Sequence, residues 1–196
     1  MKKDIILGGV GGQGILTIAA IIGTAALSEN LYLKQSEIHG MSQRGGDVQS
    51  NLRISSQPIA SDLIPEGNAD MIISVEPLEA LRYFNMLNVE TGWCITSTNP
   101  FNNLAKYPPL EDVYAEIEKL PRYIMIDAEK IAKEQGSVKA ANIVVLGASS
   151  PFLDIKREVI ENAIKTVFGK KGEDMVNLNL NAFKAGREFT ENKIKD

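Results

Sequence analysis

The chain contains 196 residues, of which 44% are hydrophobic, 23% charged and 6% aromatic, an ordinary composition for a globular protein. This length suits one domain better than two, so we expect a single domain over residues 1–196. The 21 Lys and Arg residues against 25 Asp and Glu give a formal net charge of −4, and no basic run occurs. These features argue against a nucleic-acid partner, because non-specific binding to nucleic acid depends on neutralising phosphates.

No stretch of the sequence has the pattern of a membrane-spanning or secretory segment. The longest apolar stretch, residues 15–27, is interrupted by Thr17, Gly23 and Thr24 and is shorter than the ~20 apolar residues that a membrane-spanning helix needs. The lysines near the N-terminus are followed by a glycine cluster, and no small-residue cleavage site follows a continuous apolar core. We therefore expect a cytoplasmic chain without a membrane partner.

Cys94 is the only cysteine and His39 the only histidine. An iron–sulfur cluster takes about four thiolates, and a structural zinc ion takes about four Cys or His ligands. The chain alone is therefore expected to hold neither, and we predict no metal site. Cys94 lies in the strand-like run Trp-Cys-Ile-Thr, which favours a buried structural cysteine over a catalytic one.

The first half of the chain contains strands, loops and one long helix. An apolar strand at residues 4–7 leads into a glycine-rich turn at residues 8–14. A helix rich in Ala, Ile and Leu is predicted over residues 13–29, and its apolar character on most faces predicts burial against a sheet. A second strand is predicted to begin at residues 31–33, and alternating apolar and polar side chains predict another at residues 48–54.

The second half continues this alternation. We predict strands at residues 71–75, 93–98 and 123–126, and helices at residues 76–87, 110–120, 127–135, 156–168 and 175–192. Pro77 suits a first helical turn, and Asp127 is a predicted N-cap. The apolar run at residues 140–146 fits either a strand or a buried helix. The whole pattern predicts an α/β protein with a Rossmann-like three-layer fold, a mostly parallel sheet and helices on both faces.

The glycine turn satisfies the dinucleotide-binding pattern G-x-G-x-x-G at Gly9, Gly11 and Gly14, between a strand and a helix. Glu37, 23 positions after Gly14, could supply the acidic residue that binds a ribose. However, Gly12 and Gln13 stand inside the turn, and Glu37 leads directly into a loop. These departures favour a pocket for some other anion or polar ligand over NAD, and a structural turn without any ligand stays open.

Residues 37–47 are polar and interrupted by glycines, so we predict a loop. Within it, His39 is the only side chain of the protein whose unperturbed pKa lies near neutral pH. It could orient or protonate a substrate group, or make a structural hydrogen bond to the backbone. Arg44 lies between Gln43 and two glycines, a setting that favours contact of its guanidinium with a carboxylate or a phosphate.

Two further charged patterns favour ordinary structural roles. Glu79 and Arg82 are three positions apart on one helix and are predicted to form an ion pair. The Gly-Lys-Lys-Gly run at residues 169–172 resembles the end of a phosphate-binding loop. It follows no strand and has no hydroxyl residue after its first lysine, so the sequence favours a solvated turn.

Several blocks of sequence occur in the order that is found in one known family. They are Gly-Val-Gly-Gly-Gln-Gly at residues 9–14, Glu-Ile-His-Gly-Met-Ser-Gln-Arg-Gly-Gly at 37–46, Leu-Arg-Ile-Ser at 52–55, Asp70, Glu-Pro-Leu-Glu-Ala-Leu-Arg at 76–82, and Asn99-Pro100. Together they resemble the gamma domain of the 2-oxoacid:ferredoxin oxidoreductases over about residues 4–190. The Ser-Gln-Arg-Gly-Gly block is the most specific of them.

The resemblance implies a subunit that acts only with a larger partner chain. In this family thiamine diphosphate and the iron–sulfur clusters belong to the larger chains. The reaction is oxidative decarboxylation of a 2-oxo acid to an acyl-CoA, with electrons passed to ferredoxin. A separate chain of this length is most similar to the small subunits of the indolepyruvate branch, which implies indolepyruvate or another aryl pyruvate as substrate. When isolated, the chain is expected to form a homodimer or a weakly associating species.

The resemblance also selects candidate site residues. The catalytic candidates are His39 and Arg44, and the candidates for contact with a cofactor are Gly9, Gly11, Gly12, Gln13, Gly14, Ser42, Gln43, Gly45 and Gly46. No cofactor is expected to bind this chain alone, and coenzyme A joins thiamine diphosphate and the clusters in the complex. Two rival functions stay open, namely a stand-alone NAD-binding oxidoreductase and a non-enzymatic regulatory subunit that binds a nucleotide.

Overall fold

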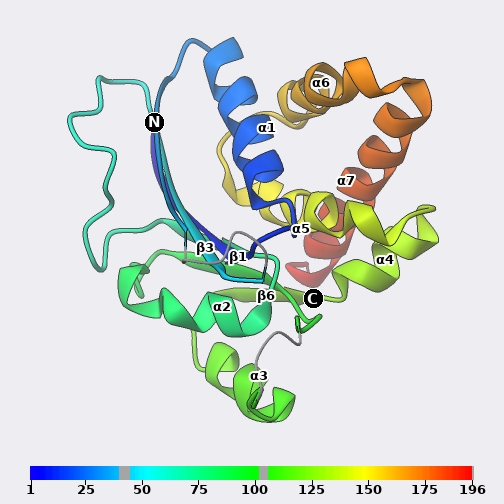
Figure 1. Cartoon of the computed structure of the whole chain (residues 1–196). Coiled ribbons are helices and arrows are strands. Elements are labelled where there is room, and N and C mark those ends of the chain that lie inside the picture. The colour runs from blue at the N-terminus through cyan, green and yellow to red at the C-terminus, as the bar shows by residue number, and fades with distance from the viewer. Residues whose placement is uncertain (40–44, 102–105, 196) are drawn as a thin grey trace.

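The structure, a computed structural model, describes residues 1–39, 45–101 and 106–195. Its described residues form one six-stranded sheet with the strand order β2-β3-β1-β4-β5-β6 (Figure 1). The strands are β1 (Lys2–Val10), β2 (Tyr32–His39), β3 (Asp47–Ser55), β4 (Met71–Ser74), β5 (Trp93–Ser97) and β6 (Tyr123–Ile126). The sheet is parallel from β1 through β4 and β5 to β6, whereas β3 runs antiparallel to both of its neighbours. The prediction of a mostly parallel sheet is confirmed, with β3 as the reversed strand.

Helices cover both faces of the sheet, as predicted (Figure 1). The thicker layer contains α1 (Ile15–Ser28), α4 (Ala128–Glu134), α5 (Ala141–Ser149), α6 (Arg157–Phe168) and α7 (Glu173–Lys193). The opposite layer contains α2 (Pro77–Arg82) and α3 (Leu110–Glu118). Short 3₁₀ helices are η1 (Phe84–Met86), η2 (Val138–Ala140), η3 (Ser150–Phe152) and η4 (Gly169–Lys171). In the described part of the chain, none of the helices is long and apolar enough to cross a membrane.

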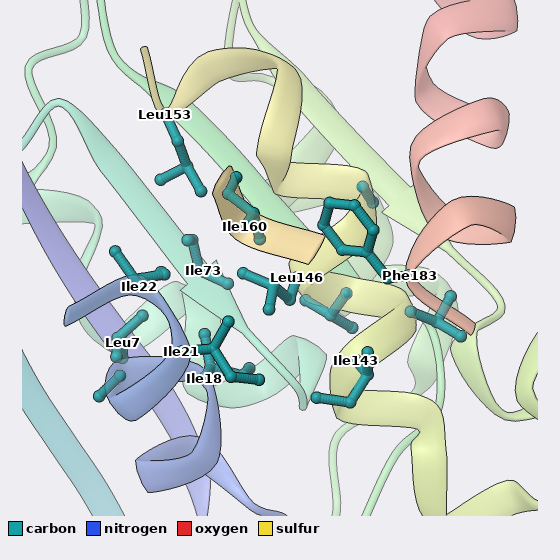
Figure 2. Packing of buried hydrophobic residues seen from close by; sticks show 14 of the residues in the cluster. Leu7, Ile18, Ile21, Ile22, Ile73, Ile143, Leu146, Leu153, Ile160 and Phe183 are labelled. Carbon is teal, nitrogen blue, oxygen red and sulfur yellow. The ribbon is translucent and has the colours of Figure 1, made fainter. Parts of the chain in front are cut away.

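The two hydrophobic clusters follow the alternation of side chains along the central strands. Ile5 and Leu7 of β1 belong to the larger cluster, under α1 and α5, whereas Ile6 between them belongs to the smaller cluster under α2. Successive side chains of a strand point to opposite faces, so the apolar run is buried on both. Figure 2 shows Leu7, Ile18 and Ile22 packed together on the thicker side.

The ambiguous run at residues 140–146 lies mostly in α5, which is buried beneath α7. Gly147 faces the Phe183 carbonyl of α7, and Gly186 faces the Val144 carbonyl of α5, so closely that a Cβ atom at either glycine would overlap backbone. The two helices therefore cross with their backbones nearly in contact. A helix with every face covered loses the periodic signal that distinguishes it from a strand.

Strand β2 begins where a strand was predicted and continues into the segment that was predicted as a loop from residue 37. Its eight residues all pair with β3, from Tyr32 opposite Ser55 to His39 opposite Val48. Residues 37–39, which we predicted in a loop, are therefore the end of an edge strand. An edge strand exposes much of its surface, so the pairing can include polar residues that carry no apolar pattern.

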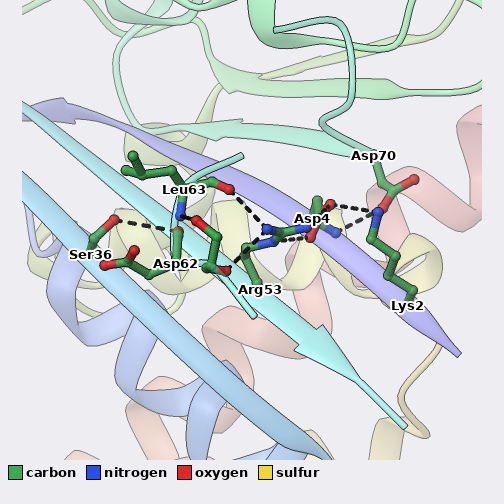
Figure 3. A network of polar contacts seen from close by, with 8 residues as sticks. Lys2, Asp4, Ser36, Arg53, Asp62, Leu63 and Asp70 are labelled. Atoms are coloured by element: carbon green, nitrogen blue, oxygen red, sulfur yellow. Dashed lines mark hydrogen bonds and ion pairs between the residues drawn. The ribbon is translucent and has the colours of Figure 1, made fainter. Parts of the chain in front are cut away.

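A buried ion pair lies at the start of β1. Asp4 is 1% exposed, and its two carboxylate oxygens accept hydrogen bonds from Nε of Arg53 at 2.8 Å and from a terminal nitrogen of the same guanidinium at 3.0 Å. Nζ of Lys2 lies 2.9 Å from Oδ2 of Asp4, and Oδ2 of Asp70 accepts the Asp4 backbone N–H at 2.7 Å. Figure 3 shows this network, which joins β1, β3 and the residue before β4.

Candidate functional site

A cavity of about 430 Å³ lies beyond the carboxyl ends of β4, β5 and β6. Strands β2 and β3 lie on one side of β1, and β4, the next strand in the chain, lies on its other side. The carboxyl ends of β1 and β4 therefore form the topological switch point of the sheet. Ligands of open α/β sheets bind at such points. The lining residues come from the glycine turn, the ends of the strands, and α4, η2 and α5: Gly12, Gln13, Val75, Ser97, Asn99, Phe101, Ala128, Glu129, Val138, Lys139, Ala141, Asn142 and Val145.

The glycine turn is held by a contact that the sequence does not reveal. Gly14 has φ = 80°, in the left-handed region, and is the N-cap of α1. Nδ2 of Asn142, from α5, donates to its carbonyl oxygen at 3.0 Å. A Cβ atom at Gly14 would overlap this amide, so the position needs glycine both for its backbone conformation and for the close approach of Asn142.

Gln13 was predicted to reach a ligand, and the structure gives it a contact within the turn. Its Oε1 accepts the backbone N–H of Val10 at 2.8 Å, and its own N–H donates to the Val10 carbonyl at 3.1 Å. Gln13 also lines the cavity together with Gly12. The side chain therefore fixes the turn at the border of the cavity.

The structure brings the two predicted glycine segments together. Gly11 donates its N–H to the Gly46 carbonyl at 2.8 Å, and Gly45 donates to the Gly11 carbonyl at 3.4 Å. Gly9 lies near the end of β1, opposite Val48, and His39 is the last residue of β2. The candidates Ser42, Gln43 and Arg44 lie outside the described residues.

A polar network that sequence reasoning missed lies at the ends of β5 and β6. Oδ1 of Asn99 accepts the hydroxyl of Ser97 at 2.7 Å and the backbone N–H of Glu129 at 2.9 Å. Nδ2 of Asn99 donates to Oδ1 of Asp127 at 2.9 Å, and Asp127 also caps α4, as predicted, by accepting the Lys130 N–H. The available signal was position, because polar residues that directly follow parallel strands gather at one edge of the sheet.

A second missed group is the carboxylate of Glu76, which is 1% exposed at the start of α2. It accepts the backbone N–H of Glu79 at 2.8 Å, the backbone N–H of Phe101 at 3.2 Å and the hydroxyl of Tyr107 at 2.5 Å. Burial, followed by this hydrogen bond, raises the pKa of Tyr107 far above its ordinary value. Glu76 thus fastens Phe101, which lines the cavity, to the end of β4.

Helix α2 packs against β1, β4 and β5 and contains two charged residues that pair with each other. The predicted Glu79–Arg82 ion pair is confirmed, with Nε of Arg82 2.8 Å from Oε2 of Glu79. Burial raises the pKa of Glu79, against the opposing effect of Arg82. Burial, with the nearby carboxylates of Glu79 and Asp47, raises the pKa of Tyr83 to about 12.

The fold does not place Glu37 where the dinucleotide-binding pattern requires an acidic residue. The acidic residue of that pattern ends the strand next to β1, so that it reaches the ribose of a nucleotide at the glycine turn. Glu37 lies on β2, and β3 separates β2 from β1. Glu37 therefore does not have the position of the ribose-binding acid, which weakens the NAD hypothesis.

Cys94 is fully buried in β5, as predicted. Burial raises the pKa of its thiol to about 12, so the reactive thiolate is scarce near neutral pH. Cys94 belongs to the smaller hydrophobic cluster, on the α2 face of the sheet. It is a structural side chain.

Comparison with known proteins identifies relatives along nearly the entire chain. The sequence pattern of the family described as pyruvate ferredoxin/flavodoxin oxidoreductase matches residues 4–189. The chain is 41% identical to the indolepyruvate oxidoreductase subunit IorB of Archaeoglobus fulgidus, across 95% of this chain and 94% of that protein. It is 38% identical to the subunit of the same name from Pyrococcus horikoshii, across 95% of both.

Solved structures share the fold at lower identity. A keto/oxoacid ferredoxin oxidoreductase gamma subunit from Geobacter sulfurreducens matches with a TM-score of 0.66 and 24% identity, over 97% of this chain and 99% of that one. A 2-oxoglutarate:ferredoxin oxidoreductase from Magnetococcus marinus, solved with 2-oxoglutarate, coenzyme A and succinyl-CoA, matches with a TM-score of 0.73 and 21% identity. This chain covers 31% of that longer one, and 97% of its own length is matched.

Proposed function

The chain belongs to the pyruvate ferredoxin/flavodoxin oxidoreductase family, and on this premise we propose that it is the small subunit of a 2-oxoacid:ferredoxin oxidoreductase of the indolepyruvate type. The observation that carries the proposal is the 41% identity to subunit IorB of Archaeoglobus fulgidus over nearly the full length of both chains. The reaction would be oxidative decarboxylation of indolepyruvate or another aryl pyruvate to an acyl-CoA, with ferredoxin as electron acceptor.

The redox groups would belong to a larger partner subunit. This sequence contains one cysteine and one histidine, too few for a cluster that takes about four thiolates. Cys94 is also enclosed in a hydrophobic cluster, where it cannot bind a metal without opening the sheet. Thiamine diphosphate would supply the carbanion chemistry of decarboxylation, and the clusters would carry single electrons.

This chain would contribute a polar wall to the shared site. The turn at residues 9–14, the residues Gly45 and Gly46 that are hydrogen-bonded to Gly11, and the cavity beside the turn lie at one edge of the sheet. Gly12 lines this cavity, and Arg44 is expected to place a positive charge nearby. A contact with coenzyme A or with the carboxylate of the 2-oxo acid suits such a wall. His39 and Arg44 would orient that ligand, since the bond-breaking chemistry needs thiamine.

Each rival function makes a different prediction. A stand-alone oxidoreductase would bind NAD(H) as the isolated chain, which the position of Glu37 disfavours. A regulatory subunit would bind a nucleotide without entering a complex that contains clusters. We propose instead that the chain works in the cytoplasm with its large partner, and that the isolated chain self-associates through the face that the partner covers.

The test compares three preparations: the large chain alone, this chain alone and the two expressed together. Each receives indolepyruvate, coenzyme A and a viologen dye as electron acceptor, and dye reduction is measured together with acyl-CoA formation. We expect both activities only in the combined preparation, from which the two chains co-purify. Full activity of the large chain alone would contradict the proposal, as would 2-oxo acid oxidation by this chain alone.

A further inference from the structure

The lysine-rich run at residues 169–172 is exposed, as predicted, and the fold also brings Lys171 beside the glycine turn. Helices α6 and α7 meet at η4, and Lys171 of η4 lines a second cavity of about 280 Å³. The opposite wall of this cavity is the backbone of Gly12 and Gly14 with the side chain of Thr17. Segments that are more than 150 positions apart in the sequence therefore form one polar pocket.

The described lining residues of this second cavity include two positive side chains and no acidic one. Lys139 comes from η2 and Lys171 from η4, so their charges enter from separate elements. The Nζ atom of Lys171 also lies 5.2 Å from the centroid of the Phe168 ring, which lines the same cavity and gives the lysine a packing partner. Two lysines in a lining that contains no acidic residue favour an anionic ligand, and the acidic Glu129 lines only the adjoining first cavity.

Polar donors complete the lining. The hydroxyl groups of Ser137 and Thr17 line the cavity with the lysines. Ser137 Oγ accepts the Lys139 backbone N–H at 3.3 Å, which leaves its hydroxyl proton for a ligand. Within the described part of the chain, the backbone N–H groups of Gly12 and Gly14 donate to no protein acceptor. Oxygen atoms of a tetrahedral anion accept hydrogen bonds of these types.

We propose that this second cavity is a binding site for a phosphate group, with Lys139 and Lys171 as its charge partners. It shares Gly12, Gln13, Lys139 and Asn142 with the first cavity. A phosphate bound in the second cavity can therefore belong to a larger molecule whose organic part extends into the first cavity, where Val75, Phe101 and Val145 supply apolar surface. The site follows from the cavity and its charges and does not require the proposed enzymatic function.

Two sources of the phosphate must be distinguished. One is the 3′-phosphate of coenzyme A, a substrate under the proposed function. The other is inorganic phosphate or another small phosphorylated molecule that binds without taking part in the reaction. Both use the same chemistry, and both lose binding when a lysine is removed.

The first arm of the experiment titrates the isolated full-length chain with inorganic phosphate by calorimetry, at constant ionic strength. The second arm measures the KM for coenzyme A and for dephospho-coenzyme A, which lacks the 3′-phosphate, in the assembled complex. The variants are Lys171→Ala and Lys139→Ala. Lys170→Ala is the matched control, because Lys170 is the neighbouring residue of η4 but does not line the cavity.

We expect each lysine variant to weaken binding about tenfold, the effect of losing one charge-assisted hydrogen bond. A rise in KM for coenzyme A but not for dephospho-coenzyme A would identify the coenzyme as the source. Loss of inorganic phosphate binding with unchanged coenzyme A kinetics would identify a separate phosphate ligand. Unchanged values in both arms, or an equal effect of Lys170→Ala, would overturn the proposal. None of these outcomes decides whether the chain is the small subunit of a 2-oxoacid:ferredoxin oxidoreductase, because 2-oxo acid oxidation by the unmodified complex tests that proposal separately.

Discussion

Asn142 and Gly14 are 128 positions apart in the sequence, yet the amide of Asn142 donates to the carbonyl oxygen of Gly14 at 3.0 Å. The contact joins the glycine turn at the start of α1 to the first turn of α5. Both residues line the second cavity, and Asn142 also lines the first. The shape of the candidate site therefore depends on a contact between the two halves of the chain.

Substitution of Gly14 by alanine tests this relationship. The left-handed backbone at Gly14 costs an alanine roughly 1–2 kcal/mol, and overlap with Asn142 adds to that cost. We expect Gly14→Ala to lower the free energy of unfolding, measured in urea, by more than the backbone cost alone. Gly169→Ala is the control, because Gly169 has φ = −54° and open space around its Cβ position.

Combining Gly14→Ala with Asn142→Ala should recover part of the loss, since the second substitution removes the overlapping amide. If the effects of the two single substitutions simply add, Asn142 does not constrain Gly14, and the proposed coupling is wrong. A double-mutant cycle on the isolated chain gives this interaction energy directly.

The Asp4–Arg53 pair makes a contrasting prediction, because it lies at the start of β1, at the opposite end of the sheet from the cavities. Removing one partner of a buried ion pair leaves the other charge uncompensated, at a cost of roughly 3–5 kcal/mol. We expect Arg53→Met to destabilise the chain by about this amount, while the kcat of the properly folded complex stays unchanged. Lys2→Ala serves as the control and should cost about 0–1 kcal/mol, because the Lys2 side chain is exposed. A drop in kcat at full folding would mean that this end of the sheet affects the site.

The sequence predicts some of these relationships and not others, for physical reasons. Strong local patterns located β1, α1, β4 and β5 within a few residues, since burial on both faces leaves continuous apolar runs. The sequence also singled out the glycine turn and the segment at 37–46, which the structure joins through Gly11 and Gly46. The reversed direction of β3 and the length of β2 depend on which strands pair, and local periodicity does not encode pairing.

The sequence does not predict the roles of Asn142, Asn99 and Glu76, because each is an ordinary polar residue whose importance comes from its neighbours in space. The solvated turn predicted at residues 169–172 is confirmed by the exposure of all four residues. The sequence does not predict that Lys171 lines a cavity with the glycine turn, because the two segments come from opposite ends of the chain.

Cys94 gives a prediction about reactivity. Its thiol is fully buried and its pKa is raised to about 12, so both access and the fraction of thiolate are low near neutral pH. We expect a thiol reagent to modify the native chain very slowly and to label one thiol per chain as soon as the protein is unfolded in guanidinium. Rapid labelling of the folded chain would place Cys94 at a surface or in a reactive environment, contrary to the structure.

Glu79 gives a prediction about pH. Burial raises the pKa of Glu79 above its ordinary value of 4.5, so the folded chain holds this proton more tightly than the unfolded chain does. The contribution of Glu79 to stability is therefore greatest below pH 4.5 and declines as the pH rises through its folded pKa. We expect Glu79→Gln to remove this decline, so that over this range the unfolding free energy of the variant rises more steeply with pH, or falls less steeply, than that of the wild type. Glu118→Gln, at an exposed position of α3, controls for the loss of one carboxyl group. A wild-type curve that rises more steeply than that of Glu79→Gln over this range would contradict the assignment.

The last prediction concerns Arg44, whose position between Gln43 and two glycines predicts a guanidinium presented to a ligand. The neighbouring Gly45 and Gly46 are hydrogen-bonded to Gly11 of the glycine turn, which places these two glycines next to the candidate site. In the assembled complex we expect Arg44→Ala to reduce kcat/KM by roughly 10- to 100-fold, as expected for the loss of a charge-assisted contact. The unfolding free energy of the isolated chain should change by less than about 0.5 kcal/mol, as for an ordinary surface substitution.

Arg157→Ala is the control for Arg44→Ala, because Arg157 forms an exposed ion pair with Glu161 on α6 and lines none of the cavities described above. Arg44→Lys separates charge from geometry. Recovery of activity by lysine indicates that a positive charge is sufficient, whereas continued loss indicates that the ligand requires the two-pronged guanidinium. If Arg44→Ala assembles normally and retains full activity, the segment at residues 39–46 has no direct contact with substrate or coenzyme. The candidate site would then be limited to the glycine turn and the two cavities beside it.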